Sequence, residues 1–210
     1  MAWVIGGSLD EAPALSVSTF FVAVSGANAA ENDKGRGVMV YGKADRDVPG
    51  WAILADLPDG WTGDCCMYAK AIGVNLVLYK GEWTGEPERV MVLNVWPSKL
   101  SSLEAEMQDD RHHYLERDAK AKVGALVFDN KSMACRGVLY EGTDHKDDAV
   151  AFCDPGLSTG VRLSWSMTLA HDDPQKSQLL DLFSLVVGQS KYLKYKDGAK
   201  DKNGNAKTRH

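Results

Sequence analysis

Residues 89–128 have the sequence RVMVLNVWPSKLSSLEAEMQDDRHHYLERDAKAKVGALVF, and the change of pattern within this stretch indicates the fold class. Residues 89–96 are mostly apolar and β-branched and end at a proline, which predicts a strand. Residues 98–123 have a serine-rich start, early carboxylates and apolar residues three, four and seven apart, which predicts a long helix. Residues 125–128 then predict another strand.

Further strands are predicted on both sides of this unit. They cover residues 37–41, 51–57, 74–79, 134–141, 149–154 and 161–170. A last helix is predicted over 175–195, with an inward stripe of leucine, valine and phenylalanine. Because hairpin-length links join most neighbouring strands, we expect an α/β (α+β) fold with a largely antiparallel sheet flanked by helices.

This order of elements resembles the PsbP/Mog1/DcrB group of small α/β/α sandwiches. The stretches that carry the resemblance are WAILADLPDGW (51–61), SSLEAEMQDDRHHYLERDAKAKV (101–123) and VRLSWSMTLAHDDPQKSQLLDLFSLVVGQ (161–189). Members of such families are mostly accessory or binding proteins, and many are exported. The resemblance therefore implies a PsbP/Mog1-like sandwich that binds a partner, and it assigns a role to no individual residue.

The start of the chain predicts an export signal over residues 1–29. Residues 14–24 form an uncharged, largely apolar run, and Ala27-Asn28-Ala29 provides a small-x-small cleavage pattern. The run is too short to span a bilayer, which takes roughly 20 residues. Cleavage leaves residues 30–195 as one α/β domain in a periplasmic or secreted setting. The alternative is a cytosolic protein in which 14–24 is buried, because residues 1–13 contain no Lys or Arg.

Charge is distributed unevenly along the chain. The formal net charge is −5, yet residues 191–210 hold seven basic and two acidic residues, so the rest of the chain is distinctly acidic. An acidic body argues against nucleic acid as the partner. Residues 196–210 have almost no apolar side chains and predict a disordered basic tail.

An even number of cysteines in an exported chain predicts disulfide bonds. The four cysteines are Cys65, Cys66, Cys135 and Cys153. A bridge between the adjacent Cys65 and Cys66 needs a strained ring, so we expect each of them to pair with one of the later two. Zinc usually requires a C-x-x-C spacing, which is absent. Free buried thiols remain the alternative if the chain is not exported.

The densest polar cluster lies on the long predicted helix. Asp109 and His113 are four residues apart, as are His112 and Glu116, so each pair shares a helix face. This spacing suits a metal ion, but it also suits ordinary surface ion pairs, which we favour, and we expect no metal and no cofactor. An alternative function stays open, namely a small metal- or thiol-dependent enzyme that uses His112 and His113.

The tryptophans suggest where a partner binds. Trp61 and Trp83 have polar neighbours, among them Asp64 and Glu86, which predicts loop positions with exposed aromatic rings. Exposed aromatic residues are frequent hot spots of protein interfaces. The expected function is an exported (periplasmic), non-enzymatic binding or accessory protein. Its expected partner is another protein, for example one that it blocks as an inhibitor or immunity-type factor.

Overall fold

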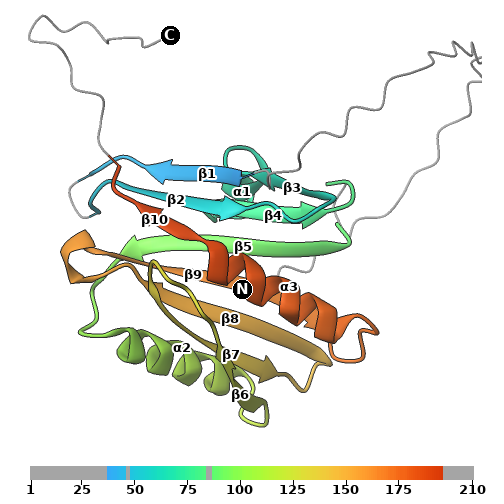
Figure 1. Cartoon of the computed structure of the whole chain (residues 1–210). Helices are drawn as coiled ribbons and strands as arrows, with labels where there is room; N and C mark the ends of the chain where they lie inside the picture. Colours follow the sequence, from blue (N-terminus) through green and yellow to red (C-terminus); the bar gives the residue numbers. More distant parts are fainter. Residues whose placement is uncertain (1–36, 46–47, 84–86, 196–210) are drawn as a thin grey trace, which may run out of the picture. The chain divides into compact units, whose positions relative to one another are not determined.

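The computed structural model describes residues 37–45, 48–83 and 87–195, which form two β-sheets (Figure 1). The 3-stranded sheet has the order β1-β2-β10, with bounds Gly37–Gly42, Trp51–Asp56 and Lys191–Leu193. The 7-stranded sheet has the order β3-β4-β5-β9-β8-β7-β6. In that order its strands cover Trp61–Asp64, Leu76–Lys80, Arg89–Pro97, Val161–Ala170, Lys146–Asp154, Ala134–Glu141 and Lys122–Val127. All neighbouring strands of the described residues in the two sheets pair antiparallel.

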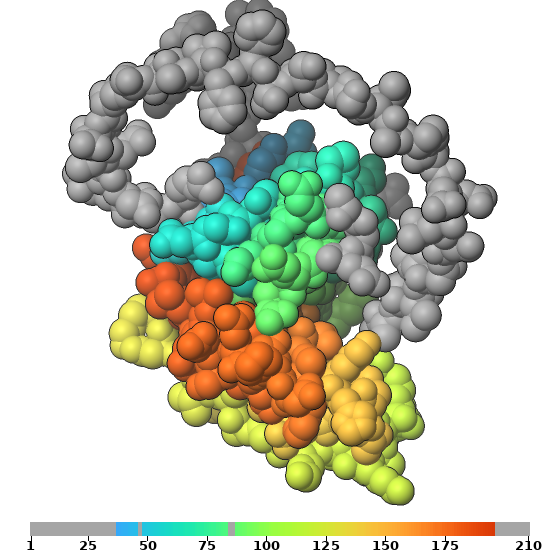
Figure 2. All heavy atoms as spheres, turned by 90° about the vertical axis from the view of Figure 1, so that its right-hand side faces the viewer, coloured from blue at the N-terminus to red at the C-terminus, as the bar shows by residue number. Residues whose placement is uncertain are grey.

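Helices cover both faces of the larger sheet. Helix α3 (Lys176–Gln189) packs against β2 and β9, and α2 (Leu103–Arg117) packs against β8 (Figure 1). Helix α1 (Tyr68–Ala71) is a single turn that follows β3 and contacts β4. A short 3₁₀ helix spans Leu157–Thr159. Figure 2 shows α3 in orange, between the green surface of the β5 region and the yellow-green surface of the α2–β6 region.

The larger apolar core joins α3 and the 3-stranded sheet to one face of the 7-stranded sheet, here called the inner face. Alternate residues of the strands point into it, as the period of two requires. Its fully buried members include Ile53, Leu93, Trp165 and Phe183. Burying a side chain of this size contributes about 1.5–3 kcal/mol to folding.

The opposite, outer face of the 7-stranded sheet carries two smaller clusters. One lies under α2 and centres on Val138, Tyr140 and Phe152. The other lies under α1 and centres on Val77 and Tyr79. The outer face therefore has two separate apolar clusters, one under α1 and one under α2.

The predicted α+β class and antiparallel sheet are confirmed by the strand order and register. The helix predicted over 98–123 is shorter, because α2 ends at Arg117 and β6 begins at Lys122. Asp118 ends the helix, since its carboxylate accepts the backbone N–H groups of Lys120 and Thr143 and holds a turn there. The last predicted helix is also too long, since residues 191–193 form a strand.

Two predicted segments at the ends of the chain fall outside the described residues. These are the export signal over residues 1–29 and the basic tail over 196–210. Within the described ranges, no helix combines the length and the apolar character needed to cross a membrane.

Candidate functional site

All four cysteines form disulfide bonds, with a pairing that differs from the predicted one. Cys135 and Cys153 face each other in the register of β7 and β8, with a Cα–Cα distance of 4.2 Å. Cys65 bonds to its neighbour Cys66, the pairing that the sequence argument discounted. The predicted bridges from 65 or 66 to 135 or 153 are wrong, because β3 lies at the opposite end of the sheet from β7 and β8.

Asp64 builds the turn that carries the Cys65–Cys66 bridge. Its Oδ1 accepts the backbone N–H groups of Cys66, Met67, Tyr68 and Ala69 at distances between 2.7 and 3.2 Å. Burial raises the pKa of Asp64, but the four N–H groups outweigh burial and hold the pKa below its ordinary value. Asp64 was predicted to contact a partner, and in the structure its carboxylate shapes the turn.

An apolar patch lies beside this turn, which we call the α1 patch: Met67, Tyr68, Ile72 and Trp83. Met67 is 62% exposed and Ile72 is 47% exposed. The rings of Tyr68 and Trp83 are stacked with centroids 4.9 Å apart, and Tyr79 meets Trp83 edge-on at 5.2 Å. The stack fixes the indole of Trp83 against the sheet while leaving it only partly buried.

The other tryptophan predicted to bind a partner lies elsewhere. Trp61 begins β3 and is only 3% exposed, packed into the larger core. The expectation of an exposed Trp61 is therefore wrong, because the residue opens a strand and not a loop. Glu86, the fourth predicted binding residue, lies outside the described residues.

The candidate metal ligands of α2 form two separate surface pairs. His112 Nε2 lies 3.2 Å from Glu116 Oε1, and His113 Nδ1 lies 3.7 Å from Asp109 Oδ2. All four side chains are between 58% and 70% exposed. Exposed pairs of this spacing contribute only a few tenths of a kcal/mol.

A different polar cluster lies at one end of the larger sheet, at the start of α3. The register places Glu141 of β7 opposite Asp147 of β8. Asp147 is fully buried, and its carboxylate contacts the ammonium of Lys176 and lies 2.9 Å from His171 Nδ1. Lys176 Nζ also lies 3.4 Å from Glu141 Oε1. We call these four residues the β8 latch.

The β8 latch contains its own cation. Burial raises the pKa of Asp147, but the bonds from Lys176 and His171 outweigh burial and leave the pKa below its ordinary value. The bond to Asp147 raises the pKa of Lys176. Glu141, Asp147 and His171 place ligand atoms within 4.8 Å of one another, as a metal site would. Because the Lys176 ammonium already lies against both carboxylates, an internal ion-pair cluster fits these residues better.

A cavity of about 420 Å³ lies between β4, β5 and the first turns of α3. It is lined by Trp61, Lys80, Glu88, Arg89, Gln175, Gln178, Leu179 and Leu182. Its charges are paired internally, since Arg89 lies 2.8 Å from Asp173 and Lys80 lies 3.8 Å from Glu88. This pairing leaves the cavity without an unmatched charge for a ligand.

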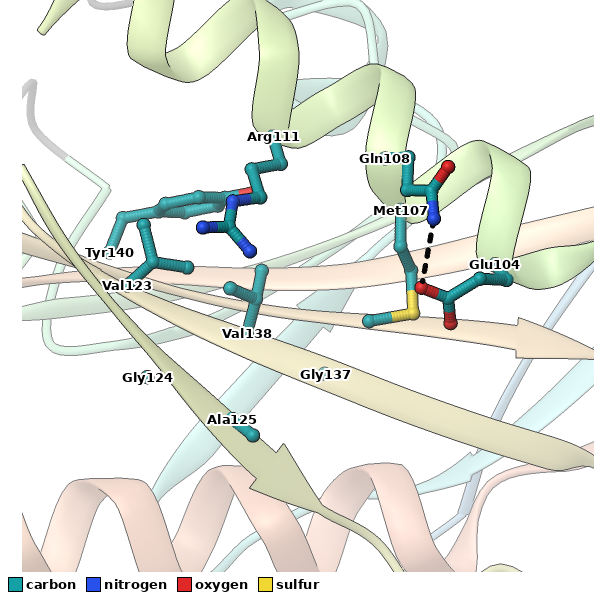
Figure 3. A pocket seen from close by; sticks show the side chains of 10 residues that line it. All are labelled: Glu104, Met107, Gln108, Arg111, Val123, Gly124, Ala125, Gly137, Val138 and Tyr140. Carbon is teal, nitrogen blue, oxygen red and sulfur yellow. Dashed lines mark hydrogen bonds between the residues drawn. The ribbon is translucent and has the colours of Figure 1, made fainter. Parts of the chain in front are cut away.

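A groove lies on the outer face between α2 and β6, with a volume of about 290 Å³ (Figure 3). The residues that line it come from α2, β6 and β7 in turn: Glu104, Met107, Gln108 and Arg111, then Val123, Gly124 and Ala125, then Gly137, Val138 and Tyr140. The α2 residues are spaced three, four and seven apart, so they form a single stripe along the helix. We call this feature the α2–β6 groove.

The carboxylates around the α2–β6 groove have partners. Glu104 accepts a hydrogen bond from Gln108 at 3.4 Å and pairs with Arg136 at 3.2 Å. Asp110 accepts a hydrogen bond from the Tyr140 hydroxyl at 2.7 Å. Burial raises the pKa of Asp110, although this hydrogen bond acts in the opposite direction.

Arg111 differs from these groups. Its guanidinium lies over the groove, beside Tyr140, Val123 and Val138 (Figure 3). Within residues 37–45, 48–83 and 87–195, its guanidinium has neither a hydrogen-bond acceptor nor a carboxylate partner. The α2–β6 groove therefore presents one unmatched positive charge above an apolar lining.

No family model matches the chain, and no curated protein matches it. Among solved structures, the chain is similar to the solution structure of cyanobacterial PsbP (CyanoP) from Synechocystis sp. PCC 6803. The match has 13% sequence identity and a TM-score of 0.43, and it covers 81% of this chain and 98% of that chain. The sequence resembles the same group, and this similarity to a solved structure concerns the fold alone.

Neither the β8 latch nor the α2–β6 groove was indicated by the sequence pattern, because each joins residues that are distant along the chain. One signal was available for the latch. Extending the predicted strand 149–154 backwards by two residues places Asp147 on the same face as Ala149 and Ala151, which are apolar. A charged residue at such an inward position predicts a buried partner of opposite charge, because an unpaired buried charge is costly.

Proposed function

We propose that this chain is an exported, non-catalytic protein that binds another protein in an oxidising compartment, the periplasm in a Gram-negative cell. The observation that carries the proposal is that all four cysteines are in disulfide bonds. Disulfides persist in oxidising compartments and are rare in the cytosol. The apolar run and the Ala27-Asn28-Ala29 pattern of the N-terminus support export as well.

The proposed partner-binding surface is the α1 patch. Met67 and Ile72 expose apolar side chains there, and Trp83 is held in place by its stack on Tyr68. Rigid aromatic rings with exposed apolar neighbours lose little entropy when a partner covers them, which favours their use at interfaces.

The finer proposal is an inhibitor or immunity-type role. The chain without its basic C-terminal stretch is acidic, so it attracts a basic partner by long-range electrostatics. A thiol-dependent enzyme gains no support, since a disulfide-bonded cysteine provides no thiolate nucleophile.

The test compares one exposed apolar residue of the α1 patch, Met67, with one exposed apolar residue elsewhere on the surface, Leu157. Wild-type protein, Met67→Asp and Leu157→Asp are expressed with their N-terminal segment in the native cell and captured after reversible crosslinking. Leu157 is 83% exposed and lies on the 3₁₀ helix, so its variant is the matched control. We expect one partner to be recovered with wild type and Leu157→Asp and to be lost with Met67→Asp. Equal recovery by all three proteins contradicts the α1 patch as the surface.

Export is tested separately by cell fractionation of the same strains. The proposal predicts that the protein is found in the periplasm or medium, with its N-terminus at Ala30. A cytosolic protein that retains Met1 contradicts export, whatever partner is recovered.

A further inference from the structure

Strand β6 is an open edge of the larger sheet. It is last in the strand order, and its only pairing among the described residues is with β7. It has six residues, whereas β3 at the other end of the sheet has four. Val127 is 89% exposed, β6 contains no proline, and its single charged residue, Lys122, lies at its first position. An extended chain can add to such an edge through main-chain hydrogen bonds.

The α2–β6 groove lies beside this edge, so alternate side chains of a strand added to β6 would point toward the groove. Alternate residues of β6 face α2, among them Val123 and the small Ala125. Residues four apart on a helix are about 6 Å apart along its axis, and alternate residues of a strand are about 7 Å apart. Two alternate side chains of one added strand therefore match the spacing of Met107 and Arg111.

The positive charge of the groove favours an added strand that has an acidic side chain. Glu104 and Asp110 already have partners, so the unmatched charge is that of Arg111. Lys122, the first residue of β6, is a second exposed positive charge near this edge, on the face opposite to Val123. An arginine above an apolar lining binds a carboxylate with charge-assisted hydrogen bonds.

We infer that the α2–β6 groove binds an extended, acidic segment of a partner protein as an added strand. Antiparallel pairing, which is found throughout this sheet, sets the order of its residues. An apolar side chain lies opposite Ala125, under Met107, and an aspartate or glutamate follows two residues later, opposite Val123 and within reach of Arg111. This site is separate from the α1 patch, and it stands whether or not that patch binds a partner.

The first test uses a labelled peptide and the full mature chain. The probe is Thr-Val-Thr-Leu-Thr-Asp-Thr-amide with a fluorophore on its N-terminus, in which Asp follows Leu by two positions, and its affinity is measured by fluorescence anisotropy. We expect saturable binding that weakens about tenfold when Asp is replaced by Asn in the peptide, because a charged hydrogen bond is lost. Raising the salt concentration should weaken binding further. A probe that does not bind overturns the inference.

Two arginines of α2 separate a specific contact from general electrostatics. Arg111→Gln removes the groove charge, and Arg117→Gln removes a charge that lies over the Tyr114 ring, outside the groove. Arg111→Gln should weaken the Asp probe about tenfold and leave the Asn probe unchanged, whereas Arg117→Gln should leave both unchanged. Equal effects of the two variants contradict the assigned role of Arg111.

A backbone test addresses strand addition itself. Alternate N-methylation of the probe removes main-chain donors without changing its side chains, so it should abolish binding. NMR shifts of the amides of residues 122–127 should change on titration with the unmodified probe. If the methylated probe binds as well, or if those amides do not respond, the segment does not bind as an added strand. A probe of reversed sequence that binds equally well contradicts the antiparallel order.

Discussion

The guanidinium of Arg162 lies 2.9 Å from the carboxylate of Glu106, and its side chain is only 1% exposed. This contact joins β9 to α2, and the same guanidinium lies 3.3 Å from Asp154 and donates to the carbonyl oxygen of Leu100 at 2.9 Å. One buried arginine thereby fixes the first turn of α2 on the outer face. Since α2 forms one wall of the α2–β6 groove, the position of that wall depends on Arg162.

Replacing Arg162 tests this attachment. Arg162→Met leaves Glu106 and Asp154, which are 12% and 17% exposed, without their cation. We expect the free energy of unfolding in urea to fall by about 3 kcal/mol, since removing one partner of a buried pair leaves a charge uncompensated. Arg136→Met is the control, because Arg136 pairs with Glu104 of the same helix but is 68% exposed. Its cost should stay below about 1 kcal/mol, and equal costs would show that Arg162 does not hold α2.

The two disulfides should differ in their effect on stability. Replacing both Cys135 and Cys153 by serine opens a loop with a sequence separation of 18 and should lower the free energy of unfolding by about 3 kcal/mol. Replacing Cys65 and Cys66 opens only a ring between neighbours, so about 1 kcal/mol or less is expected. Calorimetry without reductant measures both. A larger loss from the 65–66 pair would contradict this assignment of roles.

The β8 latch predicts an acid-dependent contribution to stability. The pKa of Asp147 lies below its ordinary value in the folded protein, so its contribution is full above the unfolded pKa and is lost as the pH falls through the folded pKa. Asp147→Asn should cost about 3 kcal/mol at pH 7, because Lys176 loses a buried partner. The difference from wild type should shrink below about pH 4. Denaturation curves from pH 3 to pH 8 measure it, and a difference that does not depend on pH would argue against an ionised Asp147.

Gly137 is required by packing. A methyl group there would overlap the Phe128 ring and lie 2.7 Å from the carbonyl oxygen of Val150. Gly137→Ala should therefore lower the free energy of unfolding by about 1–3 kcal/mol, the cost of overpacking. At Gly124, on the neighbouring strand, a methyl group would come no closer than 3.9 Å to another residue, at the Leu139 oxygen. Gly124→Ala is the matched control, and in thermal unfolding it should be neutral or slightly stabilising.

The fold was largely predictable because its elements have strong periodic patterns. The strand over 161–170 was predicted with its observed bounds, since a period of two continues through all ten residues. The end of α2 was not predictable in the same way, because it depends on the bond between Asp118 and Thr143, 25 residues away. The pattern of the isolated helix continues past that point.

The sites were less predictable, because they depend on which strands become neighbours. Cys135 and Cys153 face each other only once β7 and β8 pair in their observed register. Arg111 was part of the polar run that was analysed for metal ligands, but its place over an apolar groove follows from β6 packing beside α2. Trp61 was assigned to a loop because its neighbours are polar. In the structure it is the first residue of β3, and its side chain packs into the larger core.

The most direct test of the central claim, function in an oxidising compartment, is the state of the cysteines in native protein. Thiols are alkylated before the cells are opened, and tryptic peptides are then analysed by mass spectrometry without reduction. The account predicts that peptides 132–136 and 147–162 are joined through Cys135 and Cys153, that Cys65 and Cys66 form an internal bridge, and that no cysteine is alkylated. Alkylation of all four cysteines in a chain that still carries Met1 would contradict it.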